Sequence, residues 1–294
     1  MEQFLGLALT GVMSGCLYAL VAVSIVLVYK ATHVVSLAHG QLMAVIALFF
    51  WYCLVPWSLP LWLAIPLMLI MAAVIGLMVN GFAMRPMIGQ SSFSAFLVTF
   101  GIFIAISGFV QMNLKGVAKG LPVFLPSWSV VLAGVHLSSV HLFSFAVTII
   151  IFLGLALLFK FTTIGLGMRG TSENHQLAQS TGIGVDRIFA FIWILSTVVS
   201  AVAGVALAII MDIQYELPFL GIKGLIVALF GGLESLLGAL IAGILLGLLE
   251  TFAAGYLDPF VGGGLKDVAA YIALLILLWV KPYGLFGLVK IERI

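Results

Sequence analysis

The stretch that decides the fold is Ile188–Met211, with the sequence IFAFIWILSTVVSAVAGVALAIIM and no charged residue. A helix crosses the hydrocarbon core of a bilayer with about 20 apolar residues, so this stretch is long enough to span a membrane. The rest of the chain is similar, because 64% of its 294 residues are hydrophobic and only 7% are charged. A soluble domain carries about 25% charged residues. The composition therefore predicts an integral membrane protein and excludes a soluble one.

Similar apolar runs recur along the chain and predict an all-α, polytopic bundle of about 8–9 transmembrane spans in a single domain, residues 1–294. Residues 222–233 and 267–280 are short for a full crossing, so we expect half-helices or tilted helices there. The expected spans are residues 4–29, 34–55, 60–82, 93–113, 139–159, 188–211, 217–233, 236–254 and 267–280.

The distribution of Lys and Arg predicts the orientation, because short cytoplasmic loops are enriched in these residues. If nine spans alternate and residues 160–187 are cytoplasmic, eight basic residues fall inside and four fall outside. The inner set is Lys30, Arg85, Lys160, Arg169, Arg187, Lys281, Lys290 and Arg293, and the outer set is Lys115, Lys119, Lys223 and Lys266. The N-terminus is therefore expected outside and the C-terminus inside.

The one long polar segment is Gly165–Arg187, within a loop of about residues 160–187. A plain connector between helices needs only about 2–8 residues. The length of this loop favours an element that docks on a soluble partner. The alternative is an amphipathic helix lying on lipid, although its apolar face is small and its polar face is not basic.

Within this loop the sequence predicts a short helix over residues 172–181, outside the bilayer. Thr171 or Ser172 is a suitable N-cap, and Glu173 in the first turn suits the positive end of the helix dipole. Gly182 is well placed for a left-handed stop at the C-terminal end. The small apolar face of this helix consists of Leu177, Ala178 and Thr181.

Polar side chains inside the spans are costly and point to function. Ser36, His39 and Gln41 follow an expected turn at residues 30–33, and Gly40 could allow a non-helical start to the second span. The alternative for His39 is a hydrogen bond to a neighbouring helix. For Glu250, we weigh a functional role against an interfacial carboxylate that pairs with Lys or Arg.

Glycines at helical spacing in one span, Gly238, Gly243 and Gly247, predict close helix packing. The alternative is a broken helix beside a permeation path.

No pattern in the chain predicts an enzyme. The five histidines have no metal-ligand spacing with Cys or carboxylates, so no metal site is expected. A GxxxxGK[ST] phosphate loop is absent from the sequence, so this chain is not expected to hydrolyse ATP. The net charge of +2 is too small to predict a nucleic-acid partner.

Four stretches together resemble the permease subunits of branched-chain amino-acid type ABC importers, specifically the shorter, LivH-like half. Each is weak alone, but they occur in family order over nearly the whole chain. They are Val34–Leu42 (VVSLAHGQL), Gly167–Ile183 (GMRGTSENHQLAQSTGI), Lys223–Gly238 (KGLIVALFGGLESLLG) with the glycine-rich span up to Glu250, and Lys281–Gly287 (KPYGLFG).

The resemblance implies that the polar loop contains a coupling helix in a groove of a cytoplasmic ATPase. It implies a bacterial inner-membrane protein, surrounded by lipid, that works with a second permease subunit, expected to form a heterodimer. Two cytoplasmic ATPase subunits and a periplasmic binding protein complete the complex, and ATP is bound by the partners, so this chain needs no cofactor. The expected coupling residues are Arg169, Ser172, Glu173, Asn174, Leu177, Ala178 and Gly182, and the expected path residues are Ser36, His39, Gly40 and Gln41.

The sequence also departs from the family pattern. Ser36 and Gln41 stand where Asn and Glu are usual, Gly170 where Ala is common, Gln176 where Glu is common, and Glu234 in place of a glycine. Without a carboxylate at position 41, the sequence leaves two classes of transported solute open. One is hydrophobic amino acids such as leucine, and the other is urea or short amides. A secondary transporter or channel is a further alternative, but it would normally keep more ionisable residues in its spans.

Overall fold

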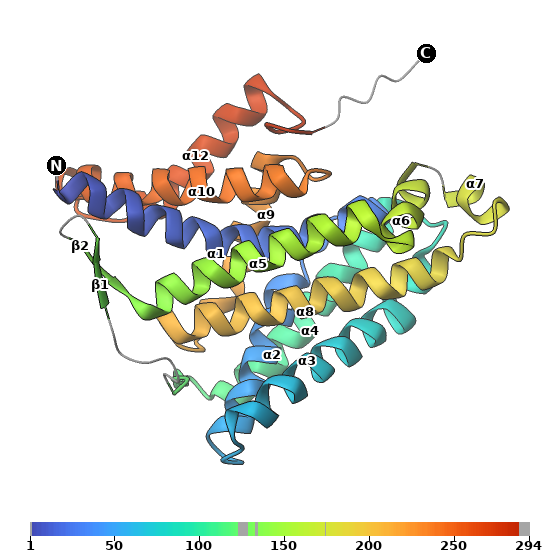
Figure 1. The fold of residues 1–294 in the computed structure, drawn as a ribbon, viewed down its shortest axis with the longest axis horizontal. Helices are drawn as coiled ribbons and strands as arrows, with labels where there is room; N and C mark the ends of the chain where they lie inside the picture. The colour runs from blue at the N-terminus through green and yellow to red at the C-terminus, as the bar shows by residue number, and fades with distance from the viewer. Residues whose placement is uncertain (1, 123–128, 133–134, 174, 288–294) are drawn as a thin grey trace.

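The computed structural model describes residues 2–122, 129–132, 135–173 and 175–287, and it is a bundle of long helices (Figure 1). In this part of the chain, six helical segments are long and apolar enough to cross a membrane. They contain α1 (Glu2–Thr32), α3 (Leu61–Met78), α4 (Ser92–Leu114), α5 (Ser139–Phe161), α8 (Val185–Met211) and α10 (Leu236–Phe252).

Shorter helical elements complete the bundle. Three apolar ones are α2 (His39–Leu54), α9 (Leu220–Gly231), which follows the 3₁₀ turn η3 (Leu217–Phe219), and α12 (Leu265–Val280). Helix α3 continues through η1 (Val79–Met84) and η2 (Arg85–Met87), and α10 continues through η4 (Ala253–Leu257) and α11 (Asp258–Val261). Each of the nine expected spans contains a helix, which confirms an all-α, polytopic membrane protein.

A small hairpin lies between α4 and α5, where no strand was predicted. Strands β1 (Ser129–Leu132) and β2 (Val135–Ser138) pair in antiparallel register, with Ser129 opposite Ser138. The hairpin lies at the same end of the bundle as the start of α1, and α6 (Thr163–Glu173) and α7 (His175–Ser180) lie at the opposite end (Figure 1). We call these the hairpin end and the α7 end.

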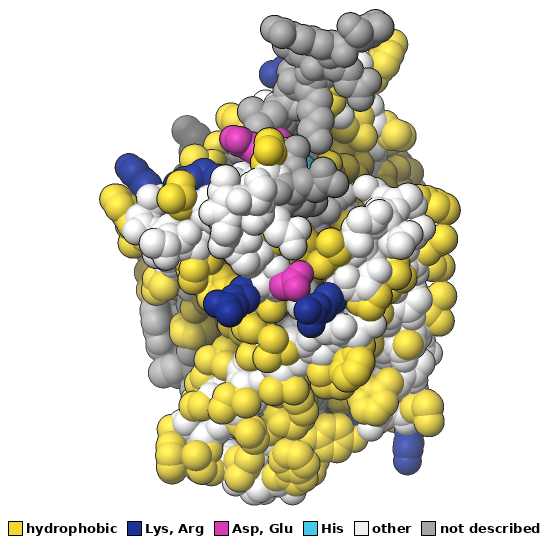
Figure 2. Space-filling model, turned by 90° about the vertical axis from the view of Figure 1, so that its right-hand side faces the viewer, with side chains coloured by type: hydrophobic (Ala, Val, Ile, Leu, Met, Phe, Trp, Pro, Cys, Tyr) yellow, Lys and Arg dark blue, Asp and Glu magenta, His cyan; other side chains and the backbone are white. Residues whose placement is uncertain are grey.

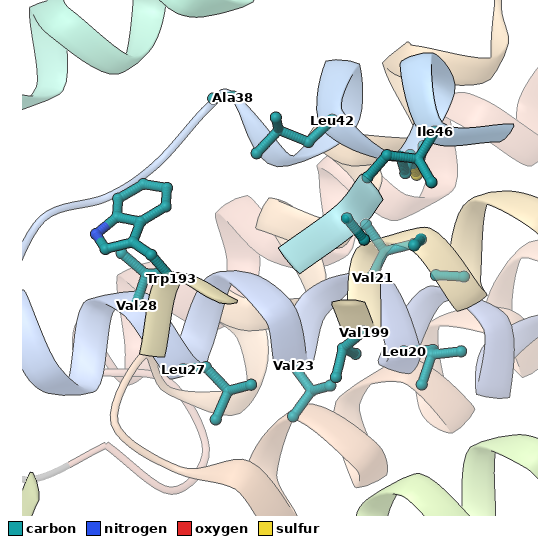
Figure 3. Packing of buried hydrophobic residues seen from close by; sticks show 14 of the residues in the cluster. Leu20, Val21, Val23, Leu27, Val28, Ala38, Leu42, Ile46, Trp193 and Val199 are labelled. Atoms are coloured by element: carbon teal, nitrogen blue, oxygen red, sulfur yellow. The ribbon is translucent and has the colours of Figure 1, made fainter. Parts of the chain in front are cut away.

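Helix α1 is the central element, because α10, α8, α9 and α5 all pack on it. Its side chains from Leu17 to Val28 are buried almost completely. Figure 3 shows this core, in which Leu20, Val23 and Leu27 of α1 lie near Trp193 and Val199 of α8. In contrast, α3, α4 and α5 present many large apolar side chains on the outside of the chain, as lipid-facing or partner-facing helices do.

Glycines bring α1 and α10 into backbone contact. A methyl group at Gly15 would overlap the backbone of Gly243, and one at Gly247 would overlap Gly11 and Gly15. Small residues allow such an approach in a membrane, where van der Waals packing drives helix association. The prediction of close packing from the glycine spacing is therefore confirmed, and α10 is not broken at Gly238, Gly243 or Gly247.

The second expected span begins later than predicted. Residues 33–38 are not helical, and α2 begins only at His39. His33 has a positive φ of 52° and ends α1. Non-helical backbone is tolerated at membrane depth only where protein covers it, and here Ser36 and Ala38 are fully buried while Thr99 of α4 accepts a hydrogen bond from the Leu37 amide. The second span therefore begins with extended residues because tertiary packing covers their backbone.

The C-terminal stretch Lys281–Gly287 folds back on the end of α9. The amide of Leu285 donates to the carbonyl of Phe230, and that of Phe286 donates to Gly231, at 2.9 and 3.0 Å. Two of the four stretches that carry the family resemblance are therefore joined by backbone hydrogen bonds.

Candidate coupling segment and translocation path

The polar loop forms two helices instead of the single predicted helix over 172–181. Helix α6 begins at Thr163, because Thr162 caps it by accepting a hydrogen bond from the Gly165 amide at 3.1 Å. Thr171 and Ser172 lie inside α6, so their prediction as N-caps was wrong, and Glu173 is the last residue of α6 instead of a first-turn residue.

Close packing explains why a glycine-rich segment is helical here. A methyl group at Gly167 would meet Ile188 Cδ1 at 2.7 Å, and one at Gly170 would meet Ile183 Cδ1 at 3.4 Å. The glycines leave room for these isoleucines on α6. Tertiary contacts therefore outweigh the low helix propensity of glycine.

The predicted stop at Gly182 is confirmed. Gly182 has φ of 86°, its amide donates to the Gln179 carbonyl at 3.1 Å, and the Ile183 amide donates to the Ala178 carbonyl at 3.0 Å. This pair of hydrogen bonds is the Schellman motif. It fixes the end of α7 and turns the chain toward α8.

The predicted coupling residues differ in exposure and contacts. Arg169 donates to the carbonyl of Phe159 at 2.9 Å and so caps the end of α5. Leu177 is 65% exposed, whereas Ala178 is only 4% exposed. Glu173 and Gly182 are exposed, Ser172 is half-buried, and Asn174 lies outside the described residues.

A hydrogen bond connects this segment to the start of the second span. His33 Nε2 lies 2.9 Å from the carbonyl oxygen of Ser172. His33 directly precedes the extended residues 34–38, which lead to His39 in the core. A hydrogen bond therefore joins α6 to the residue that precedes this extended segment.

The α7 end carries the described members of the basic set that the sequence analysis assigned to the inside. Figure 2 views this end and shows Lys and Arg side chains spread over it. Arg85 forms an ion pair with Asp186 at 3.1 Å, and Lys30 lies over the ring of Phe159. Lys290 and Arg293 lie outside the described residues.

The predicted path residues are brought together in the interior. Ser36 and His39 are 0% exposed and Gln41 is 1% exposed. His39 Nδ1 lies 2.9 Å from Ser36 Oγ, and its ring stacks on Trp193 with centroids 5.6 Å apart. The polar partner of His39 is thus a residue of its own segment.

Gly40 has a different role from the expected one. It lies in the first turn of α2, where a methyl group would overlap the carbonyl of Pro218, and a methyl group at Gly221 would overlap Gly40. The starts of α2 and of η3–α9 are therefore in backbone contact. Ser36, His39, Gly40 and Gln41 line none of four cavities found among the described residues, whose volumes are about 580, 390, 280 and 190 Å³.

The sequence analysis missed a buried polar cluster between α1, α9 and α10. Lys223 Nζ lies 3.1 Å from Glu250 Oε1, and Tyr18 donates its hydroxyl proton to Glu250 Oε2 at 3.0 Å. Pairing of Glu250 with a lysine is confirmed, but Glu250 is 1% exposed and Lys223 lies in α9 instead of an outer loop. The available signal was a pair of opposite charges in two neighbouring expected spans, 217–233 and 236–254.

Among the described residues, no three His, Cys, Asp or Glu side chains lie close enough to hold a metal ion. The arrangement is a helical membrane bundle with a polar, capped segment at one end and a sparse set of buried polar groups inside. Fold and composition together define a multi-pass helical membrane protein.

Residues 7–280 match the family described as the permease component of branched-chain amino acid transport systems, and the chain belongs to this family. It is 28% identical to the high-affinity branched-chain amino acid transport system permease protein BraD of Pseudomonas aeruginosa, over 99% of this chain and 98% of that protein. The LivH permease of Escherichia coli is 25% identical with the same coverage. A probable LivH permease of Methanocaldococcus jannaschii is 29% identical, over 92% of this chain and 89% of that protein.

A solved structure supports the fold alone. PsaBC from Streptococcus pneumoniae, in complex with a Fab, aligns with a TM-score of 0.52 at 15% identity, over 96% of this chain and 93% of that chain.

Proposed function

We propose that this chain is the transmembrane permease subunit of an ATP-driven ABC importer in a bacterial inner membrane. In this proposal the chain catalyses no reaction and binds no cofactor. ATP is hydrolysed by two cytoplasmic ATPase subunits, and a second permease subunit completes the passage as a heterodimer. A periplasmic binding protein delivers a small solute, with branched-chain or other amino acids as the first choice. Membership of the permease family supports this proposal.

The single observation that carries the coupling role is the exposed Leu177 on a capped helix at the basic end of the bundle. An apolar side chain that is 65% exposed, on a helix fixed by the Schellman motif, is suited to a preformed contact with a soluble protein. In this orientation the α7 end is cytoplasmic and the hairpin end faces the periplasm.

The hydrogen bond between His33 and the Ser172 carbonyl supplies a route for coupling. Closure of the ATPases displaces α6 and α7, and this bond transmits the displacement to the extended residues 33–38. Ser36, His39 and Gln41 follow directly, so we place them in or beside the path. Because these side chains are buried in the described conformation, the passage opens only when the helices move.

Substitution Leu177→Asp tests the docking role. An unpaired carboxylate in the contact costs several kcal/mol, so we expect loss of ATPase copurification or loss of solute-stimulated ATP hydrolysis, with normal membrane insertion. Gln179→Asp is the matched control, because it introduces the same charge at a residue that is exposed on another face of α7. Wild-type coupling in Leu177→Asp at normal expression rejects the docking role.

A further inference from the structure

A cavity of about 280 Å³ lies at the α7 end, between the end of α1, η1 and η2, the start of α4 and the start of α8. The exposure of its wall residues falls from mouth to floor. Gln90 and Ser92 are exposed, whereas Ala95 and Phe189 are 2% and 6% exposed and Trp193 is 0% exposed. The cavity therefore opens at the surface of the α7 end and stops at the Trp193 ring.

Trp193 separates this cavity from two residues assigned to the path. Its ring stacks on His39, with centroids 5.6 Å apart and planes 25° apart. His39 Nδ1 in turn lies 2.9 Å from Ser36 Oγ. Trp193 lines the cavity, whereas Ser36 and His39 do not. The indole is thus the part of the cavity wall that covers His39 and Ser36.

The surroundings of Trp193 fix its backbone but leave space beside its ring. A methyl group at Gly76 of α3 would lie 2.7 Å from the Trp193 carbonyl oxygen, so α3 holds this part of α8 in place. Because protein interiors are close-packed, a ring as large as indole turns only where there is space next to it, and the cavity supplies that space. Rotation of the side chain into the cavity would uncover His39 without moving α8.

The Trp193 ring also lacks the hydrogen bond that a buried tryptophan usually makes. Its Nε1 is buried and has no partner among the described residues, and the same is true of His39 Nε2. The nitrogen-bearing edge of the indole points away from Val199 and Leu20 (Figure 3). A missing hydrogen bond disfavours the conformation that buries the donor. The closed position of the ring is therefore not held tightly, and a solute or water that enters between the two rings can accept from the indole.

We infer that Trp193 is the gate residue at the α7 end of the translocation path. In the described conformation its ring closes the passage from Ser36 and His39 to the cavity, and the cavity is the vestibule by which solute leaves. His33 lines the same cavity and lies 2.9 Å from the Ser172 carbonyl oxygen of α6, so the vestibule wall includes a contact with the coupling segment. The inference rests on the proposed function, which places Ser36 and His39 beside the path and the α7 end in the cytoplasm.

The test measures how fast a cysteine in place of Ser36 reacts with the membrane-impermeant reagent 2-sulfonatoethyl methanethiosulfonate, added from the cytoplasmic side. The reporter Ser36→Cys is combined with Cys16→Ala and Cys53→Ala in the assembled complex, in inside-out membrane vesicles. With Trp193 in place we expect slow labelling. Trp193→Ala should raise the labelling rate at least about ten-fold, because the reactivity of a thiol follows its exposure. Trp193→Phe keeps a ring over His39 and should label as slowly as the parent.

Phe189→Ala is the matched control, because Phe189 is another buried ring in the wall of the same cavity, one helical turn nearer the start of α8. It should leave the labelling of Ser36→Cys slow. Ser92→Cys, at the exposed mouth, should label rapidly with either residue at position 193, which checks that Trp193→Ala keeps the vestibule folded. If Trp193→Ala does not assemble, Trp193→Leu decides. It keeps much of the apolar volume but removes the ring stack, so its labelling rate should still exceed that of Phe189→Ala.

The inference is overturned if Ser36→Cys reacts rapidly with Trp193 in place, or equally slowly in the Trp193→Ala variant. It is also overturned if Phe189→Ala raises the rate as much as Trp193→Ala does, since the effect would then be a general loosening of α8. Ser92→Cys reports separately on orientation. Labelling of Ser92→Cys in right-side-out vesicles only would count against the proposed function, whereas its labelling from the cytoplasmic side with no response at Ser36→Cys would count against the gate alone.

Discussion

Two ion pairs of the same length lie in very different surroundings. Lys223–Glu250 and Arg85–Asp186 both have a nitrogen–oxygen distance of 3.1 Å. The side chains of the first pair are 12% and 1% exposed, and those of the second are 65% and 57% exposed. The first lies between α1, α9 and α10, and the second joins η2 to the start of α8 at the α7 end.

The difference in burial shows that the nitrogen–oxygen distance alone does not determine how much an ion pair contributes to the stability of the fold. Water screens the exposed pair, so its contribution is about 0–1 kcal/mol. The buried pair interacts strongly but has lost its hydration, so its net contribution is small while removal of one partner is very costly. A buried pair that adds little net stability is more easily understood as a functional site than as a structural one.

The largest expected effect comes from Lys223→Met, which leaves Glu250 buried without its cation. We expect a loss of about 3–5 kcal/mol in the free energy of unfolding, measured by SDS titration with tryptophan fluorescence. Lys223→Met/Glu250→Leu should recover most of this loss. A single variant as stable as the wild type would show that Lys223 does not compensate the Glu250 charge.

The next effect tests whether close helix packing holds the buried cluster together, since Tyr18 and Glu250 lie on α1 and α10. In Gly243→Ala, the new methyl group would lie 2.6 Å from Ala19 Cβ and 2.6 Å from the Gly15 carbonyl oxygen. Overpacking of this kind costs about 1–3 kcal/mol, so the same titration should show a loss of that size.

Gly154→Ala is the matched control for this prediction. Gly154 lies inside α5, and a methyl group there meets no atom within 4 Å. It should leave stability unchanged or raise it slightly, because alanine is the better helix former. Equal losses in the two variants would contradict the packing explanation.

The nine apolar segments could be predicted because hydrophobic run length is a local property of the sequence. Gly182 could be predicted for the same reason, since a left-handed helix stop requires glycine locally. The glycine-rich part of α6 and the extended residues 33–38 could not, because they depend on contacts with residues distant in sequence, such as Ile188 and Thr99. The depth of Lys223 was likewise hidden, because a lysine inside a short apolar segment reads as a loop residue until its partner on α10 is known.

The smallest effect is expected for Arg85→Gln at the exposed pair. Because both side chains are more than half exposed, we expect a loss of about 0.2–1 kcal/mol in the free energy of unfolding at low salt. Dissolved ions screen exposed charges, with a Debye length of about 8 Å at physiological ionic strength that shortens as salt is added. This loss should therefore shrink at higher salt. The effect of Lys223→Met should hardly change with salt, because water and ions do not reach Glu250. A salt-independent loss above about 2 kcal/mol in Arg85→Gln would mean that another element covers Arg85 and Asp186 in the assembled protein. The two ion pairs would then differ in burial only in the isolated chain, and both would be buried in the assembled complex.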